Sequence, residues 1–268
     1  VTAGPAGSTA GSGSVIDMSA ADVALAAGSS IAGDTLRFGS CPTTAALELG
    51  GASGLGAWQL DAGELALLSS ALLKVEADDG AITGHALAQA DTAALGAVEL
   101  IAAAVNVAAA ADFRSLRALS NATTVSADVT TRGGDLQLGV TGAGALTIAG
   151  GCSLQSSARL LLSATGNVAV TGPTLLAAGG DLAVARALLQ LLGGGLFDLQ
   201  ADTDIDGAGS IALPAATVAL AASQLLLTSA DIALLGPLSL GASTFIATAG
   251  VGGAARMLVG DNFAASSD

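Results

Sequence analysis

The chain has 268 residues, of which 52% are hydrophobic, 11% charged and only 2% aromatic. Its formal net charge is −14, with 8 Lys and Arg residues against 22 Asp and Glu residues. This acidic balance excludes nucleic acid and an anionic membrane surface as primary partners. The high hydrophobicity and the low charge content exclude intrinsic disorder. The longest apolar stretch, from Ala93 to Ala111, is mostly alanine and carries Glu99 and Asn106, so no membrane span is expected.

The chain begins with residues 1–14, which are rich in Gly, Ala, Ser, Thr and Pro and predict a flexible lead-in. An irregular half follows at residues 15–132, in which apolar residues recur at uneven intervals: Val15, Val23, Ile31, Leu47, Leu60, Leu65, Leu72 and Ile82. Two stretches rich in Ala and Leu compete there as helices, Glu64–Ala77 and His85–Leu119. Because Val98/Leu100 and Val105/Val107 keep a period of two, strands are the preferred prediction.

A regular half at residues 133–249 repeats an apolar position about every seven residues. These positions are Leu136, Leu146, Leu154, Leu160, Val168, Leu175, Leu182, Leu189, Phe197, Ile205, Ile211, Val218, Leu225, Ile232, Leu238 and Phe245. A coiled coil would also show a period of seven, but it would pair each position with an apolar residue three or four further on. Here the partners stand two further on, as in Leu136/Leu138, Leu182/Val184 and Ile232/Leu234. A period of two indicates β-strands.

Helix breakers separate these short strands, for example Gly133-Gly134, Gly172-Pro173 and Gly236-Pro237. Turns of two or three residues are too short for the crossovers of ordinary parallel βαβ units. We therefore expect an all-β fold, a parallel β-helix (β-solenoid) in which about three short strands and roughly 22 residues make one turn, with turns stacked about 4.8 Å apart. The solenoid is expected to span residues 15–249, and residues 250–268, which lose the alternation, to form a C-terminal cap or tail.

Three segments carry a family resemblance: Gly180-Asp181-Leu182-Ala183-Val184, Gly134-Asp135-Leu136-Gln137-Leu138 and Ser229-Ala230-Asp231-Ile232-Ala233-Leu234. They resemble the repeat units of filamentous-haemagglutinin-like and autotransporter-passenger-like β-solenoid surface proteins. The resemblance covers roughly Leu136 to Gly250 and implies a secreted protein at the cell surface that acts as an adhesin.

Few residues offer chemistry. His85 is the only histidine and stands in Gly84-His85-Ala86, where a turn or surface role is expected. Cys41 and Cys152 lie about five predicted turns apart, beyond the reach of a disulfide, so the sequence predicts buried, inert thiols or thiols that cross-link neighbouring chains.

Asp202, Asp204 and Asp206 carry acids at alternate positions, as the start of a calcium loop does, but position 12 is Leu213 instead of a bidentate Glu. On a strand, the alternation would place the three carboxylates on one outward face. A solvated acidic corner is the default expectation, and a surface calcium site is the alternative; no other cofactor is expected.

A β-helix enzyme that cleaves acidic polysaccharides, a lyase or hydrolase, is the main alternative function. Such a site would need clustered basic residues in an aromatic-lined groove, whereas the arginines look scattered along the chain: Arg37, Arg114, Arg117, Arg132, Arg159, Arg186 and Arg256. We therefore expect no enzyme but a non-catalytic, extracellular structural or adhesive rod. It would either associate with itself end to end into a surface fibre or bind cell-surface ligands; a carbohydrate-binding adhesin that acts as a monomer is a further alternative.

Overall fold

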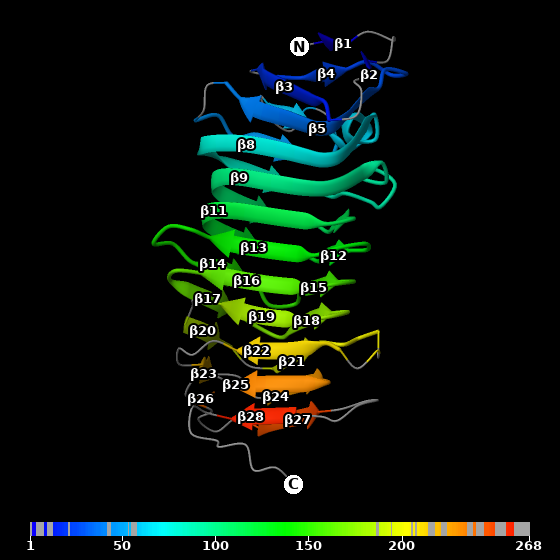
Figure 1. The fold of residues 1–268 in the computed structure, drawn as a ribbon. Helices are drawn as coiled ribbons and strands as arrows, with labels where there is room; N and C mark the ends of the chain where they lie inside the picture. The colour runs from blue at the N-terminus through cyan, green and yellow to red at the C-terminus, as the bar shows by residue number, and fades with distance from the viewer. Residues whose placement is uncertain are drawn as a thin grey trace.

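A computed structural model describes residues 2–3, 8–9, 13–20, 22–41, 44–52, 54, 58–185, 188–193, 195–204, 206, 208–213, 218–220, 224–234, 238–239, 244–249 and 256–259. Strands account for 62% of the structure and helix for 2%. The strands are parallel and stack in about 9 turns that lie about 22 residues apart in the chain (Figure 1). The predicted fold class, an all-β parallel β-solenoid, is confirmed.

Each regular turn has one strand on each of three faces, which we call faces A, B and C. Face A contains β3 (Val15–Ala20), β5 (Ile31–Ser40), β8 (Leu68–Gly84), β9 (Leu95–Val107), β11 (Leu116–Val125), β13 (Leu136–Val140), β16 (Leu160–Ala164), β19 (Leu182–Ala185), β22 (Ser210–Leu213), β25 (Asp231–Leu234) and β28 (Arg256–Val259). Face B contains β6 (Leu47–Leu49), β7 (Gln59–Leu60), β14 (Leu146–Ile148), β17 (Asn167–Val170), β20 (Leu188–Leu191), β23 (Val218–Leu220) and β26 (Leu238–Ser239). Face C contains β10 (Ala111–Phe113), β12 (Val129–Thr131), β15 (Ser153–Ser156), β18 (Thr174–Ala178), β21 (Leu196–Gln200), β24 (Gln224–Ser229) and β27 (Thr244–Ala249).

Three long strands bend across two faces in the irregular half. β8, β9 and β11 run without interruption from face A to face B, which gives the broad curved ribbons of Figure 1. The first part of β11 pairs with β13 on face A, and its last residues pair with β14 on face B. The separate strands of the regular half are therefore the same ladder with a break at the corner.

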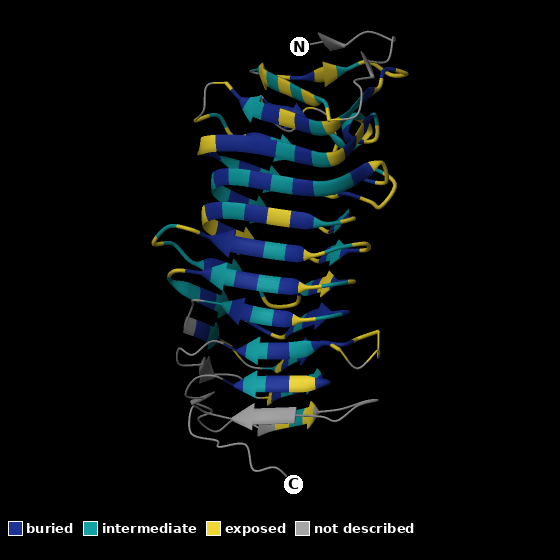
Figure 2. Cartoon of the chain, viewed as in Figure 1, coloured by how far each residue is buried: buried dark blue, intermediate teal, exposed yellow. Residues whose placement is uncertain are grey.

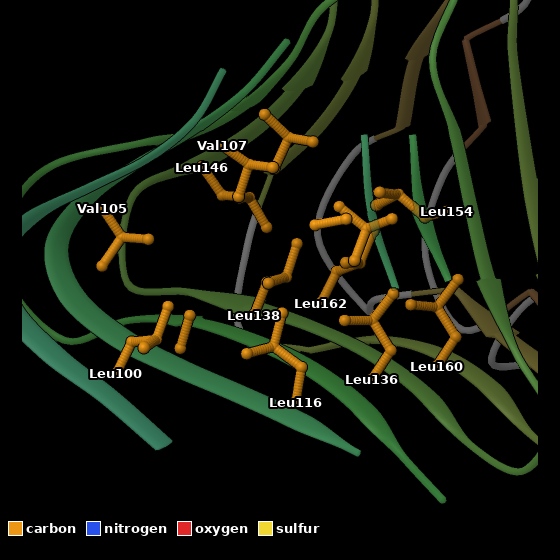
Figure 3. Close-up of a cluster of buried hydrophobic side chains, with 14 of the residues drawn as sticks. Leu100, Val105, Val107, Leu116, Leu136, Leu138, Leu146, Leu154, Leu160 and Leu162 are labelled. Carbon is orange, nitrogen blue, oxygen red and sulfur yellow. The ribbon is translucent and has the colours of Figure 1, made fainter. Parts of the chain in front are cut away.

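The interior is filled by columns of aliphatic side chains that stack from turn to turn (Figure 3). On face A, Leu116, Leu136, Leu160 and Leu182 pair in direct register, and each is at most 1% exposed. Strand residues alternate between buried and more exposed positions (Figure 2). The predicted period of two is thus confirmed by burial at Leu136/Leu138, Leu146/Ile148, Val168/Val170, Leu182/Val184, Ile211/Leu213, Leu225/Leu227 and Ile232/Leu234.

The predicted register is wrong by one residue at three positions. Val15 is 66% exposed, and the neighbouring Ile16 packs against the core instead. Likewise Leu73 and Leu176 are buried, whereas the predicted Leu72 and Leu175 lie on the outer side of their strands and are half-buried. Of the other predicted positions, Ile205 and the side chains of Val218, Leu238 and Phe245 lie outside the described residues.

The two stretches that compete as helices, Glu64–Ala77 and His85–Leu119, form strands and turns almost throughout, so the preferred prediction of strands is confirmed there. One short helix, α1 (Ala62–Leu65), overlaps the first of them. A capping box fixes its start, because the Asp61 carboxylate accepts from the Glu64 N–H at 2.8 Å and the Glu64 carboxylate accepts from the Asp61 N–H at 3.1 Å. The Leu25 N–H also donates to Glu64, at 3.0 Å.

Strands also occur in both predicted terminal segments. β1 (Thr2–Ala3) pairs with β4 (Ala24–Leu25), and β2 (Ser8–Thr9) pairs with β5. β28 lies within the predicted C-terminal cap or tail and pairs with β25. The other residues of 250–268 lie outside the described part, so the predicted boundaries at 14, 132 and 249 stay predictions. Among the described residues, no helix has the length and apolar character needed to cross a membrane.

Candidate functional site

The acidic cluster lies in a loop and not on a strand, so the predicted strand placement of these residues is wrong. Asp202, Asp204 and Asp206 follow β21 in the corner that leads to β22. This turn of the solenoid is longer than its neighbours: Leu182 pairs with Ile211, 29 residues further on, whereas Leu160 pairs with Leu182, 22 residues further on. The additional residues bulge out at the corner.

The backbone anchors one end of this loop. Asp202 is 7% exposed and has a φ of 58°, a left-handed conformation that Asp tolerates better than most residues. Its N–H donates to the Gly180 carbonyl at 3.1 Å, and the Thr203 N–H donates to the Ala178 carbonyl at 3.1 Å. Gly209 lies against this anchor, because a Cβ there would be 2.4 Å from the Asp202 nitrogen.

The three carboxylates are close enough to share one cation. One oxygen of each of Asp202, Asp204 and Asp206 lies within 4.8 Å of the others. Two oxygens that both bind calcium at about 2.3–2.6 Å cannot lie more than about 5 Å apart, so the separation is compatible with a calcium site. Asp204 and Asp206 are exposed, and the Asp206 carboxylate also accepts from the Ala208 N–H at 2.8 Å. The calcium hypothesis therefore stays a prediction.

His85 has a carboxylate partner that sequence reasoning missed. Its Nε2 lies 2.6 Å from Oε2 of Glu48, and both side chains are half-buried. The backbone N–H of His85 donates to the Leu49 carbonyl at 2.8 Å. The two residues are far apart in sequence and meet because β6 pairs with the end of β8, where Glu48 stands opposite Thr83.

Both thiols are free. Cys152 is buried, and burial, with a smaller contribution from the Asp128 carboxylate, raises the pKa of its thiol above the ordinary value. The predicted burial is confirmed for Cys152, and its inertness stays a prediction. The prediction of a buried thiol is wrong for Cys41, which is exposed beside the end of β5.

A charge network lies on the outer side of face A near the N-terminal turns. Arg37 contacts Glu76 and also Asp17, the latter at 3.1 Å, and Lys74 Nζ lies 2.7 Å from Oε1 of Glu76. Burial disfavours the charged form of Glu76, but hydrogen bonds and charges from Lys74 and Arg37 outweigh it and lower the pKa of this carboxyl. The network fixes the only lysine of the chain in a structural ion pair.

The arginines are less scattered than the sequence suggests. Arg114, Arg117 and Arg132 line depressions at one corner of the solenoid, where face C passes into face A. They are close in space because the β11 turn pairs in register with β9, 18 residues earlier, and with β13, 20 residues later. The aromatic side chain at this corner, Phe113, is only 4% exposed. These depressions therefore differ from the aromatic-lined groove expected of a polysaccharide-cleaving enzyme.

Comparison of the chain with protein-family models, with curated proteins and with solved structures finds no match. The class is therefore defined by the fold alone, and it is that of the parallel β-solenoids.

Proposed function

We propose that this chain is a rigid, non-catalytic rod that acts outside the cell as a structural or adhesive element. The observation that supports the proposal is the continuity of its ladders. The face C sheet runs in parallel register from β10 through β12, β15, β18, β21 and β24 to β27. Such a stack distributes an axial load over every hydrogen bond of a turn, because each strand is held by the strands one turn before and one turn after it.

The charge distribution supports the same role. A net charge of −14 with one lysine keeps the outer surface acidic, which discourages lateral aggregation of exposed sheet faces. The proposed location at the cell surface rests on the resemblance of three segments to filamentous-haemagglutinin-like and autotransporter-passenger-like proteins. Assembly end to end would extend the same ladders into a surface fibre.

Microscopy together with a degradation assay tests the proposal. The purified chain is imaged by negative stain over a range of concentrations, and it is incubated with acidic and neutral polysaccharides while new reducing ends and unsaturated products are measured. Discrete rods that attach to cells or glycans, or filaments of constant width, support an adhesive or a fibre-forming rod. Turnover of any polysaccharide by the chain contradicts a non-catalytic role and favours the lyase or hydrolase alternative.

A further inference from the structure

Three depressions at the corner between faces C and A form one continuous groove. The largest has a volume of about 670 Å³ and lies among Ser70–Ala71, Ala93–Ala97, Arg114–Ser115 and Gly133–Asp135. The second, of about 270 Å³, shares Ala93, Arg114 and Gly133 with it. The third, of about 310 Å³, shares Ala97, Ser115 and Asp135 with it. The groove therefore crosses the turns of β8, β9, β11 and β13, and we call it the corner groove.

Two glycines shape the floor of the corner groove. A Cβ at Gly96 would lie 2.4 Å from the Ala71 carbonyl oxygen, so only glycine lets the β9 turn approach β8 this closely. A Cβ at Gly133 would lie 3.0 Å from Cγ of Arg114. The aliphatic part of Arg114 thus lies over bare backbone, and a larger residue at 133 would displace this arginine.

Arg114 is the one arginine of the groove without an acidic partner in the described structure. Arg117 Nη1 lies 2.6 Å from Glu99, and Arg132 is paired with Asp112. Arg114 is exposed, and its guanidinium forms neither an ion pair nor a hydrogen bond within the described residues. Its guanidinium is a rigid, permanently charged fork that matches a carboxylate. Glu99 and Asp112 balance the other two arginines of the groove, whereas Asp135, which also lines it, forms no ion pair within the described residues.

A buried hydroxyl without a partner lies beneath the groove, shielded from its accessible surface. Ser70 is 8% exposed, and its Oγ has no hydrogen-bond partner among the described residues. A buried polar group left unpaired costs about 1–3 kcal/mol, so such groups generally meet a ligand or an ordered water. Nearby, the Ser115 hydroxyl donates to the Asp135 carbonyl at 3.0 Å and keeps lone pairs that can accept.

We infer that the corner groove binds an acidic oligosaccharide that carries one carboxylate among many hydroxyls. Arg114 would hold the carboxylate, and Ser115 and the Asp135 carboxylate would exchange hydrogen bonds with the hydroxyls. A densely charged polymer fits less well, because a single unpaired guanidinium faces it and the protein as a whole carries a charge of −14. This inference deepens the adhesive form of the proposed function and rests on it for its biological setting.

The test is a titration of the intact chain with two disaccharides of the same size, cellobiouronic acid, which has one carboxylate, and cellobiose, which has none. Amide chemical shifts are followed by NMR. We expect binding of cellobiouronic acid with a Kd on the order of 1 mM, shifts confined to amides near Ser115 and Gly133, and little response to cellobiose. Arg114→Gln should weaken binding about tenfold or more, because a charge-assisted hydrogen bond is lost. Ser115→Ala should weaken it a few-fold, because a neutral hydrogen bond is lost.

Arg159→Gln is the matched control, because Arg159 is an exposed arginine two turns beyond Arg114 that lines none of the three depressions. It should bind like the unchanged chain, and circular dichroism checks that every variant is folded. The inference is overturned if cellobiose binds as well as cellobiouronic acid, if Arg159→Gln loses as much affinity as Arg114→Gln, if a heparin tetrasaccharide binds more tightly than cellobiouronic acid, or if nothing binds at about 10 mM. Each of these results concerns the groove, whereas microscopy and polysaccharide turnover concern the rod.

Discussion

Gly150 and Gly172 stack on successive turns so closely that a Cβ built on either one lies 2.7 Å from the Cα of the other. Both follow a face B strand at the corner that leads to face C, and the Gly151 N–H donates to the Pro173 carbonyl there at 2.7 Å. The distance between turns at this corner is therefore set by backbone meeting backbone. Any side chain at either position must push two turns apart.

Replacement of Gly172 by alanine should destabilise the protein more than replacement of a glycine whose Cβ would have room. Gly172→Ala is expected to lower the free energy of unfolding by about 1–3 kcal/mol, as overpacking does. Gly180→Ala is the control, because its Cβ would meet the Ala158 carbonyl oxygen at 3.4 Å, an ordinary contact, and it should change stability by no more than about 0.5–1 kcal/mol. Urea unfolding measures both variants. Equal losses would show that the corner does not limit the packing of turns.

Two adjacent leucines of β16 test the register of the solenoid. Leu162 is fully buried in a core column, whereas Leu161 lies on the outer side of face A between Gln137 and Ala183. Leu162→Ala should cost about 2–5 kcal/mol of stability because it leaves a cavity. Leu161→Ala should cost less than about 1 kcal/mol. Urea unfolding measures both variants. A larger loss of stability for Leu161→Ala than for Leu162→Ala would mean that Leu161, and not Leu162, points into the core.

The ion pairs of Glu76 predict a pH dependence of stability. Because the folded pKa of Glu76 lies below its unfolded value, its contribution is present above the ordinary value of 4.5 and is lost as the pH falls through the folded pKa. At pH 7, Glu76→Gln should lower the free energy of unfolding by roughly 1–3 kcal/mol. The lower end of this range is expected, because solvent screens the ion pair with the partly exposed Arg37. The difference from the unchanged chain should shrink as the pH is lowered below about 4.5.

Asp78→Asn provides the control for this prediction, since Asp78 is an exposed carboxylate of the same strand that forms no ion pair within the described residues. Thermal unfolding at several pH values gives the comparison. A Glu76→Gln variant whose deficit stays constant from pH 7 to about pH 3 would contradict a role for ionised Glu76.

The acidic loop predicts stabilisation by calcium. If Asp202, Asp204 and Asp206 share one ion, calcium that binds only the folded state should raise Tm with concentration, with a Kd in the range of about 0.1–1 mM typical of weak extracellular sites. Asp204→Asn should remove this rise because one of three ligands loses its charge. Asp79→Asn, which alters an exposed carboxylate on β8, should keep it. The same Tm rise in both variants would reflect general screening of an acidic protein. A chelator that does not reverse the calcium-induced rise in Tm would also contradict the site.

The fold was predictable because apolar residues two apart recur at a nearly constant interval, and that pattern has one physical solution when the intervening turns are too short for helices. Among the predicted positions whose burial the structure describes, the register failed where two apolar residues are adjacent, at Val15-Ile16, Leu72-Leu73 and Leu175-Leu176. There, alternation alone does not say which residue faces inward. The longer turn that places Asp202 in a loop breaks the interval, so local spacing could not indicate it.

The corner groove could not be predicted in the same way. Arg114 and Arg132 come together only when the length of their particular turn is known, since one or two residues more would move an arginine to another position on the corner. Ser70 gives no signal in the sequence, because its burial and its unpaired hydroxyl depend on the approach of the β9 turn at Gly96. A mean repeat length of about 22 residues is too coarse to place either feature.

Stretching single molecules between their two ends tests the proposed mechanical role most directly. If each turn is held by its neighbours alone, force should peel the stack in steps of one or a few turns, each turn of about 22 residues releasing roughly 70–80 Å of chain. A single step that releases the whole chain at once, at a force no higher than that of an ordinary globular domain, would contradict the rod.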